Sequence, residues 1–517
     1  MTMYQGDWTE RLAQLFGERE AIVDVDDKGE VRQRITYDEL RMRVAATAAA
    51  LVEHGVTQGA RVAIVAKNRV EHLELLFACA RLGALFLPVN WRLAAPEVQY
   101  ILGDATPSVV VVEPAFLPLV QGYAPPDGGR AVVVAVDDFA REVAARRAQH
   151  RATGATVAPA QAAVSTDDAW IILYTSGTTG NPKGALLPYR QVAFNALNTI
   201  VALDLSSSDK TVTYTPLFHT GGLHVLTTPM FANGGCIVLC DGFDADRVLE
   251  LTAREQCTVL FGVPTTYERM VESALFKSGR GLAVRLALCG GAPCPRSLID
   301  TWNNRGVVFK QGYGLTECGP NVLNLNPADV VRKAGAAGRP NLTITAVVVE
   351  DDGRVVRGAG RGELCLGGPC VCLGYWNKPD QTKASFTTGE RGVPAGLLKT
   401  GDVVEVDDEG FMTIVDRKKD MFISGGENVY PAEVEKVLSD HPRVRAAAVI
   451  GIPSAQWGEV GRAYVEAKDA AAPVEVDDLL AFARARLARY KVPKEVVVVH
   501  ALPRNPSGKV QKHLLTR

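Results

Sequence analysis

The sequence predicts an α/β protein with a large N-terminal domain and a smaller, mobile C-terminal α+β domain. In the first half, short apolar runs rich in β-branched residues alternate with helical stretches, as in α/β sheets with buried strands. Short β runs with many glycines between residues 340 and 415 predict a small β subdomain. The charged segment RKKD then follows Asp416 and precedes a compact unit. We therefore expect domains at 1–416 and 417–517.

Individual elements of the N-terminal domain follow from their patterns. Apolar runs at 61–67, 108–113 and 131–136 predict buried strands, and helical periodicity at 72–85 predicts a helix between the first two. The Ala-rich stretch at 140–164 predicts an exposed helix followed by a linker.

The C-terminal unit begins with a predicted helix. Pro431 suits a first helical turn, and Val434, Val437 and Leu438 then fall on one face. The rest of the unit predicts strands at 446–453, 463–468 and 496–500, and an amphipathic helix at 478–491.

Composition excludes several classes of protein. The 517 residues carry 56 Lys+Arg against 58 Asp+Glu, which gives no reason to expect nucleic acid or an anionic membrane as a partner. No run reaches the roughly 18 apolar residues of a membrane span, and the polar N-terminus lacks a signal-peptide core. The ten cysteines contain no CxxC pair, so we expect reduced thiols and a cytoplasmic protein.

The strongest chemical signal is the segment WIILYTSGTTGNPKGA at 170–185. A strand-like run ends in a loop whose glycines allow consecutive backbone N–H groups to point at one anion, while hydroxyls and a lysine add donors. This composition is typical of a polyphosphate cradle, although the Walker A spacing is absent. The candidate residues are Thr175, Ser176, Gly177, Thr178, Thr179, Gly180 and Lys183.

This loop resembles the signature loop of the adenylate-forming superfamily, which includes acyl-CoA synthetases. Further motifs follow in the family's order: PLFHTGG (216–222), CGGAP (289–293), QGYGLTE (311–317), GYW (374–376), KTGD (399–402), DRKKDMFISGGENVYPAEVE (416–435) and RNPSGKVQK (504–512). The resemblance spans essentially the whole chain. It implies that a carboxylic acid attacks the α-phosphorus of Mg-ATP, and that coenzyme A then attacks the resulting acyl adenylate.

The resemblance also assigns the nucleotide site. Thr316 would donate to the α-phosphate, Glu317 would hold Mg²⁺, Asp402 would accept from the ribose hydroxyls, and Arg417 would contact the ribose or phosphate. Tyr313 would stack near adenine, where Gly291 and Ala292 allow a close approach of the backbone. The further cofactor-binding residues are Gln311, Gly312 and Gly314.

Two lysines and a histidine complete the implied machinery. Lys509, in the PSGK turn, would reach the α-phosphate and the substrate carboxylate, whereas Lys512 is expected to be solvated. His219 would line the passage to the acyl pocket and orient the carboxylate. Lys419 would be the hinge about which the small domain rotates, and Gly425 and Gly426 would then line the pantetheine tunnel.

The acyl substrate is left open by the sequence. The expected pocket residues, at 219–225, 263, 266, 290–292 and 312–314, are small or apolar and offer no partner for a substrate ammonium. A medium- or long-chain fatty acid is favoured, with an aromatic acid of the cinnamic, ferulic or benzoic type as the alternative.

Two other functions are possible interpretations of the sequence: an enzyme that loads a separate carrier protein, and a non-catalytic nucleotide-binding module. Intact Lys509, Glu317 and Asp402 argue against the non-catalytic module. The expected partners are the acid, ATP and coenzyme A, with a second copy of the chain as a further candidate.

Overall fold

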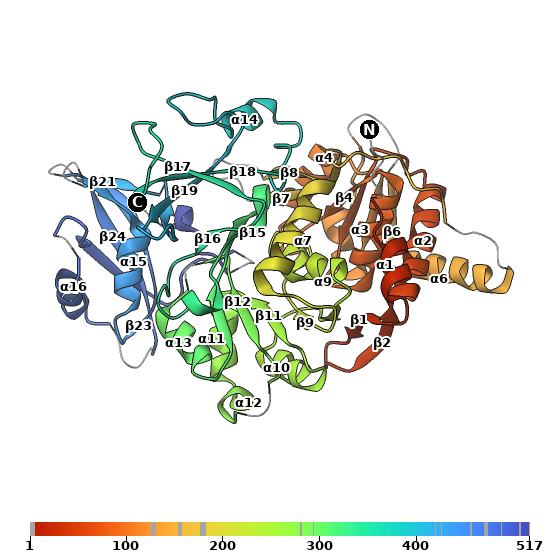
Figure 1. The fold of residues 1–517 in the computed structure, drawn as a ribbon, viewed down its shortest axis with the longest axis horizontal. Coiled ribbons are helices and arrows are strands. Elements are labelled where there is room, and N and C mark those ends of the chain that lie inside the picture. Colours follow the sequence, from red (N-terminus) through yellow and green to blue (C-terminus); the bar gives the residue numbers. More distant parts are fainter. Residues whose placement is uncertain are drawn as a thin grey trace.

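The computed structural model describes most of the 517-residue chain. The described ranges are 6–125, 131–153, 158–175, 182–279, 282–292, 294–418, 420–424, 427–454, 457–469, 474–487, 489–505 and 508–515. Figure 1 shows a large N-terminal part, in red to green, and a smaller blue C-terminal part beside it. No helix within these ranges is long and apolar enough to cross a membrane.

A six-stranded sheet forms the first layer, in the order β6-β5-β3-β4-β7-β8. All its neighbours run parallel except β7 and β8, which form an antiparallel pair. Its central strands are buried, whereas the edge strand β6 is half exposed. The strands are β3 Arg61–Val65, β4 Leu85–Pro88, β5 Val109–Val112, β6 Val132–Ala135, β7 Ala169–Thr175 and β8 Lys183–Pro188. The predicted buried strands at 61–67 and 108–113 are therefore confirmed. The run at 131–136 does form a strand, but the expectation that it is buried is wrong, because β6 lies at the edge of the sheet and is half exposed.

Helices cover this sheet. The predicted helix at 72–85 is α3, which ends where Gly83 adopts a left-handed conformation. The predicted exposed helix is α6, which projects from the side of the molecule in Figure 1. The helices are α1 Thr9–Phe16, α2 Tyr37–Glu53, α3 Val70–Leu82, α4 Ala95–Ala105, α5 Leu117–Val120, α6 Val136–Thr153 and α7 Tyr189–Leu203, with a 3₁₀ turn η1 at Pro114–Phe116.

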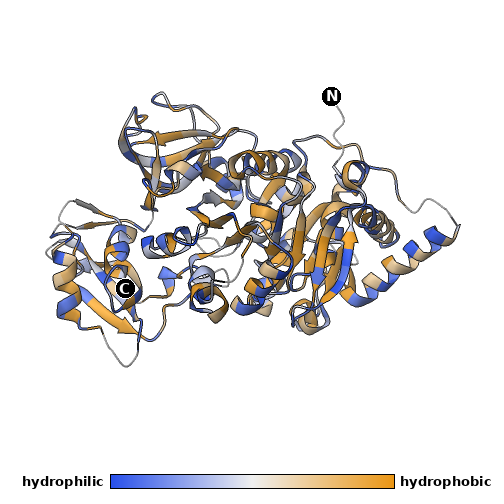
Figure 2. Cartoon of the chain, turned by 60° about the horizontal axis from the view of Figure 1, so that its bottom comes forward, coloured by the Kyte–Doolittle hydropathy of each residue, from blue (hydrophilic) through white to orange (hydrophobic). Residues whose placement is uncertain are grey.

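Two further sheets continue the N-terminal domain. One has the order β2-β1-β10-β9 and the other consists of parallel strands β11-β12-β13. Their strands are β1 Glu20–Val25, β2 Val31–Thr36, β9 Lys210–Thr213, β10 Cys236–Leu239, β11 Val259–Gly262, β12 Leu286–Cys289 and β13 Val308–Gln311. Their helices are α8 Thr220–Gly222, the π-helix η2 Leu223–Thr227, α9 Thr228–Ala232, α10 Ala245–Arg254, α11 Pro264–Glu272, α12 Ala274–Lys277 and α13 Arg296–Asn303. Figure 2 shows many strands of the chain as hydrophobic, and β1, β10, β11 and β12 are buried, whereas β2 is largely exposed.

The glycine-rich region forms two antiparallel sheets. A short sheet β14-β15-β16 leads into the four-stranded sheet β17-β18-β19-β20, which is the predicted β subdomain. The elements are β14 Tyr313–Leu315, η3 Thr316–Cys318, β15 Gly319–Asn324, η4 Pro327–Asp329, β16 Arg339–Pro340, β17 Thr345–Val349, β18 Gly360–Gly367, α14 Pro379–Ala384, β19 Leu398–Val406 and β20 Met412–Arg417.

The C-terminal part is a separate sheet with helices packed on it. Strands β22-β21-β24-β23 are antiparallel, and β25 pairs parallel with β24. Pro431 is the first residue of α15, as predicted, and Val434 and Leu438 are buried. The elements are β21 Phe422–Ser424, β22 Glu427–Val429, α15 Pro431–Ser439, β23 Val444–Ser454, β24 Gly458–Ala467, α16 Val476–Arg484, β25 Glu495–Val499 and η5 Lys512–Leu514.

Candidate active site

The predicted phosphate loop starts and ends on the antiparallel pair β7 and β8. Register places Thr175 opposite Lys183, so the last residue before the loop and the lysine after it lie side by side. The Nζ atom of Lys183 lies 5.5 Å from the ring centroid of Tyr375. The loop residues Ser176, Gly177, Thr178, Thr179 and Gly180 lie outside the described residues.

The QGYGLTE motif forms the end of β13, the strand β14 and the turn η3. A Cβ atom added to Gly314 would lie 2.2 Å from the backbone carbonyl of Pro320, so only glycine fits between β14 and β15. Thr316 is buried, and its carbonyl accepts a hydrogen bond of 2.9 Å from the side chain of Gln191 on α7. This packing fixes the backbone that carries Glu317.

The predicted ribose carboxylate, Asp402, joins Tyr313 and Arg417. The Tyr313 hydroxyl donates to Oδ2 of Asp402 at 2.6 Å, and the Arg417 guanidinium lies 2.6 Å from Oδ1. Burial raises the pKa of Asp402, while Arg417, Tyr313 and Lys509 oppose that rise. Burial and the Asp402 charge raise the pKa of Tyr313 well above its usual value, so the phenol stays a donor. A carboxylate offers about four acceptor positions, so about two remain for a ligand.

Glu317 has a partner that sequence reasoning did not identify. The hydroxyl of Tyr375 donates to Oε1 of Glu317 at 2.9 Å. The sequence pattern contained Tyr375 only as part of the GYW motif, without a role. Its position between Glu317 and Lys183 brings the predicted metal ligand and the predicted phosphate lysine to one tyrosine.

His219 precedes the short helix α8 as its N-cap. Its Nδ1 atom accepts a hydrogen bond of 3.0 Å from the backbone N–H of Gly221. The imidazole is accessible to solvent, and the pKa of His219 is lowered by the protein groups that crowd it and by the positive charge of Lys509. The neutral imidazole therefore carries its proton on Nε2, which is left as a hydrogen-bond donor.

Lys509 lies in a tight turn of the C-terminal part. The Lys509 N–H donates to the side chain of Asn505 at 2.8 Å, and the Asn505 N–H donates back to the Lys509 carbonyl at 2.8 Å. Gly508 has a left-handed φ of 84°, and a Cβ atom added to it would lie 3.4 Å from Oγ1 of Thr265 in the N-terminal domain. The charge of Lys509 lowers the pKa of both His219 and Asp402. The structure thus brings Lys509, His219 and Asp402 into one site from three separate parts of the chain.

The CGGAP motif follows β12 and faces the expected acyl pocket. Gly291 has a left-handed φ of 81°. A Cβ atom added to Gly291 would lie 3.6 Å from Val263, and one added to Gly290 would lie 3.4 Å from Phe261. Ala292 is half buried beside them. Gln311 ends β13 opposite Cys289, and Gly312 packs against Leu288.

A small cavity lies beside Gly221 and Gly222, which follow His219 in the sequence. Its volume of about 10 Å³ is close to what one water molecule requires. The hydroxyl of Thr211 is buried and has no hydrogen-bond partner within the described structure. The cavity is lined by Thr211, Val212, Thr213, Thr215, Gly221, Gly222, Leu226, Thr227 and Phe261.

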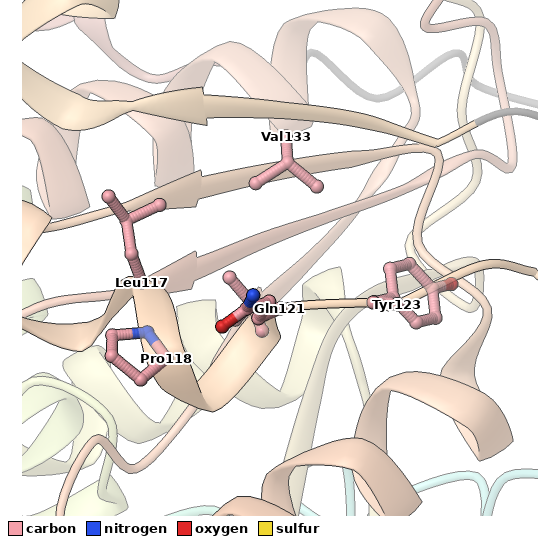
Figure 3. Close-up of a pocket in the computed structure, with 7 residues that line it drawn as sticks. Leu117, Pro118, Gln121, Tyr123 and Val133 are labelled. Carbon is pink, nitrogen blue, oxygen red and sulfur yellow. The ribbon is translucent and has the colours of Figure 1, made fainter.

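A larger cavity of about 380 Å³ lies elsewhere, beside the edge strand β6. Leu117 and Tyr123 line it together with Val133 (Figure 3). None of the predicted site residues borders it, so it does not belong to the candidate active site.

Three more predicted residues lie outside the described structure, and one further prediction is wrong. Lys419, Gly425 and Gly426 lie outside the described residues. The expectation that Lys512 is solvated is wrong, because its Nζ atom lies 2.8 Å from Oε1 of Glu435 and its side chain is 21% exposed. The carboxylates of Glu435 and Asp416 raise the pKa of Lys512, which makes it a structural cation of the small domain.

Comparison with known proteins agrees with the motifs. The model of the AMP-binding enzyme family matches residues 9–376, and the model of the AMP-binding enzyme C-terminal domain matches residues 433–509. The chain belongs to the AMP-binding enzyme family. A feruloyl-CoA synthase of Amycolatopsis is 39% identical over 92% of both chains. A long-chain-fatty-acid–CoA ligase of Mycobacterium tuberculosis is 36% identical over 93% of this chain and 92% of its own.

A solved structure of the same family carries ligands. The o-succinylbenzoate coenzyme A synthetase of Bacillus subtilis, in complex with ATP and magnesium ion, superimposes with a TM-score of 0.83 at 30% identity. The alignment covers 98% of this chain and 99% of that one. The likeness therefore includes both the large and the small domain of this family member.

Proposed function

We propose that this chain is an acid–CoA ligase whose preferred substrate is an aromatic acid with a hydroxyl on its ring. The chain is an AMP-forming ligase that uses ATP, Mg²⁺ and coenzyme A to convert a carboxylic acid into its thioester, as do its relatives. The single observation that carries the substrate class is the threonine-lined cavity beside Gly221 and Phe261.

The charges of the site suit adenylate formation. Negative charge grows on the phosphoryl oxygens as the carboxylate attacks, and fixed cations and donors aimed there lower the barrier. We assign this task to Lys509, Thr316 and the loop between Thr175 and Lys183. The Nε2 proton of His219 is free to hold the substrate carboxylate, because Gly221 occupies the other ring nitrogen.

The donor set also fits Mg²⁺. This ion usually binds one or two protein carboxylates and completes its shell with water and phosphate oxygens. Glu317 supplies such a carboxylate, and no cluster of three or more His, Cys, Asp or Glu side chains in the described residues competes for a metal. When bound, Mg²⁺ would neutralise charge on the departing phosphates. Glu317 would hold the ion in place, and Asp402 with Arg417 would anchor the ribose.

We place the domain boundary at 416/417 with a hinge near Lys419. Support comes from the sheets: β20 ends at Arg417 within the four-stranded sheet, and β21 begins at Phe422 within the C-terminal sheet. After adenylate formation, rotation at this point would move Lys509 out of the active site. It would bring in the tunnel glycines Gly425 and Gly426 for thioester formation. We also infer a cytoplasmic location, supported by ten cysteines that form no disulfide.

The threonines favour a hydroxylated aromatic ring over an alkyl chain. The cavity has room for one hydroxyl-sized group, and an alkyl terminus there would leave the buried Thr211 hydroxyl without a partner. A ring hydroxyl would satisfy it, and a site built to hydrogen-bond such a group discriminates strongly against analogues that lack it. A fatty acid, which the sequence favoured, becomes the second candidate, and the likeness to the mycobacterial long-chain-fatty-acid–CoA ligase supports it.

A substrate panel tests this assignment. Release of pyrophosphate, AMP and thioester is measured with ferulic, 4-hydroxycinnamic and cinnamic acids beside octanoic and palmitic acids. We expect the hydroxylated acids to give the highest kcat/KM, and Thr211→Val, which exchanges a hydroxyl for a methyl group, to remove their advantage over cinnamic acid. Higher kcat/KM for palmitic acid, or an unchanged ratio in Thr211→Val, would refute the substrate class. Adenylate formation without any response to coenzyme A would instead point to a carrier protein.

A further inference from the structure

Tyr375 contacts two groups that the proposed function assigns to Mg²⁺ and to the phosphates of ATP. Its hydroxyl donates to Oε1 of Glu317 at 2.9 Å, and its ring lies under the Lys183 ammonium, 5.5 Å from centroid to Nζ. Glu317 is the expected Mg²⁺ ligand and Lys183 closes the expected phosphate loop. A single side chain therefore sets the distance between them.

The backbone around Tyr375 is held firmly in place. The segment pairs with β8 directly after Lys183, through an antiparallel bridge between Tyr375 and Ala185 and a hydrogen bond of 2.8 Å from the Trp376 N–H to the Gly184 carbonyl. The Tyr375 N–H donates to the Thr382 hydroxyl at 2.9 Å.

The same segment also binds the backbone of the metal ligand. The Cys372 N–H donates to the Glu317 carbonyl at 2.8 Å. Glu317 is therefore held at its carbonyl by Cys372 and at its carboxylate by Tyr375, both from one stretch of chain. Such a double attachment fixes the direction in which the carboxylate points.

We propose that Tyr375 is a positioning residue that orients the Glu317 carboxylate for Mg²⁺ and holds Lys183 beside it. This inference rests on the proposed role of Glu317. The phenol occupies Oε1 and leaves Oε2 to face the ion. A phenylalanine in its place would keep the ring under Lys183 and would release only the carboxylate.

Tyr375 presents a neutral donor to this carboxylate, because its hydroxyl donates to Oε1 of Glu317 at 2.9 Å. A neutral donor on one oxygen orients a carboxylate without neutralising its charge. Residues that orient metal ligands in this way typically contribute about 10- to 100-fold to metal affinity.

The experiment compares Tyr375→Phe with a matched control and a reference variant. The control is Tyr174→Phe, which also removes a tyrosine hydroxyl from a carboxylate, because Tyr174 donates to Asp104 at 2.6 Å. The reference is Glu317→Gln. Titration calorimetry measures ATP binding in EDTA and with increasing Mg²⁺, and electron paramagnetic resonance measures Mn²⁺ bound with ATP.

We expect Tyr375→Phe to bind ATP normally in EDTA and to need about 10- to 100-fold more Mg²⁺ or Mn²⁺, while Tyr174→Phe matches the wild type. If Tyr375→Phe binds the metal as tightly as the wild type while Glu317→Gln binds it weakly, the inference about Tyr375 is refuted and the role of Glu317 stands. Weak ATP binding by Tyr375→Phe in EDTA would overturn it too, because the phenol would then support the fold rather than the metal ligand. Wild-type metal binding in Glu317→Gln would refute the role of Glu317 itself.

Discussion

Replacing Asp402 by asparagine tests the ribose site that the structure assembles. The carboxylate holds Tyr313 and Arg417, and its side chain is 5% exposed, so its charge acts in a dry environment. Asparagine keeps one acceptor oxygen but presents an NH₂ group to one of two donors. Hydrogen bonds to charged groups are worth about 1.5–3 kcal/mol, so ATP affinity should fall about 10- to 150-fold.

The assay is a thermodynamic cycle with 2′,3′-dideoxy-ATP. The wild-type enzyme should bind this analogue about 10- to 150-fold more weakly than ATP, because it lacks both ribose hydroxyls. Asp402→Asn should bind ATP and the analogue with nearly equal affinity, since the acceptor is already lost. A matched control is Asp416→Asn on the neighbouring strand, whose carboxylate caps the N–H groups of Arg417 and Ala432. If the analogue binds more weakly than ATP by the same factor in the wild type and in Asp402→Asn, the proposed contact between Asp402 and the ribose is refuted.

Three further predictions concern packing, pH and the hinge. Gly314→Ala should lower the free energy of unfolding by about 1–3 kcal/mol or more, because the added Cβ overlaps the Pro320 carbonyl. Gly103→Ala is the control, since open space surrounds that position, and it should be neutral or stabilising. Thermal denaturation measures both variants. Burial lowers the pKa of His72 and His224 to about 3. The unfolded chain therefore binds more protons than the folded chain below pH 6.5. The free energy of unfolding should fall by about 2 kcal/mol per histidine between neutral pH and pH 5. Urea denaturation of His72→Gln should show a shallower fall over this pH range. Lys419→Pro should leave single-turnover adenylate formation intact and block thioester formation, because proline fixes φ at the hinge; normal thioester formation would place the pivot elsewhere.

The sequence predicted most of the fold, and its motifs named the candidate site residues. Continuous apolar runs predicted β3 and β5 because parallel strands inside a sheet are buried on both faces, and Pro431 marked the start of α15. A similar run predicted β6, but its place at the sheet edge leaves that strand half exposed. Motif residues such as Glu317 and Asp402 could be predicted one by one.

Pairwise contacts could not be predicted in the same way. Tyr375 and Glu317 are 58 residues apart, and periodicity carries no information about which distant side chains meet. Lys512 was misjudged for the same reason, since its partner Glu435 lies on α15. The unpartnered hydroxyl of Thr211 depends on how β9 packs against η2, which local pattern does not encode.

The most direct test of the account is a rapid-quench measurement of the two half-reactions in wild type and Lys509→Ala. With acid, Mg²⁺ and ATP but no coenzyme A, the wild type should release one pyrophosphate per active site. Addition of coenzyme A should then yield AMP and thioester in equal amounts. Lys509→Ala should slow the first step about 10²–10³-fold and spare thioester formation from supplied acyl adenylate. Release of ADP and phosphate, or an equal loss in both steps, would contradict the account.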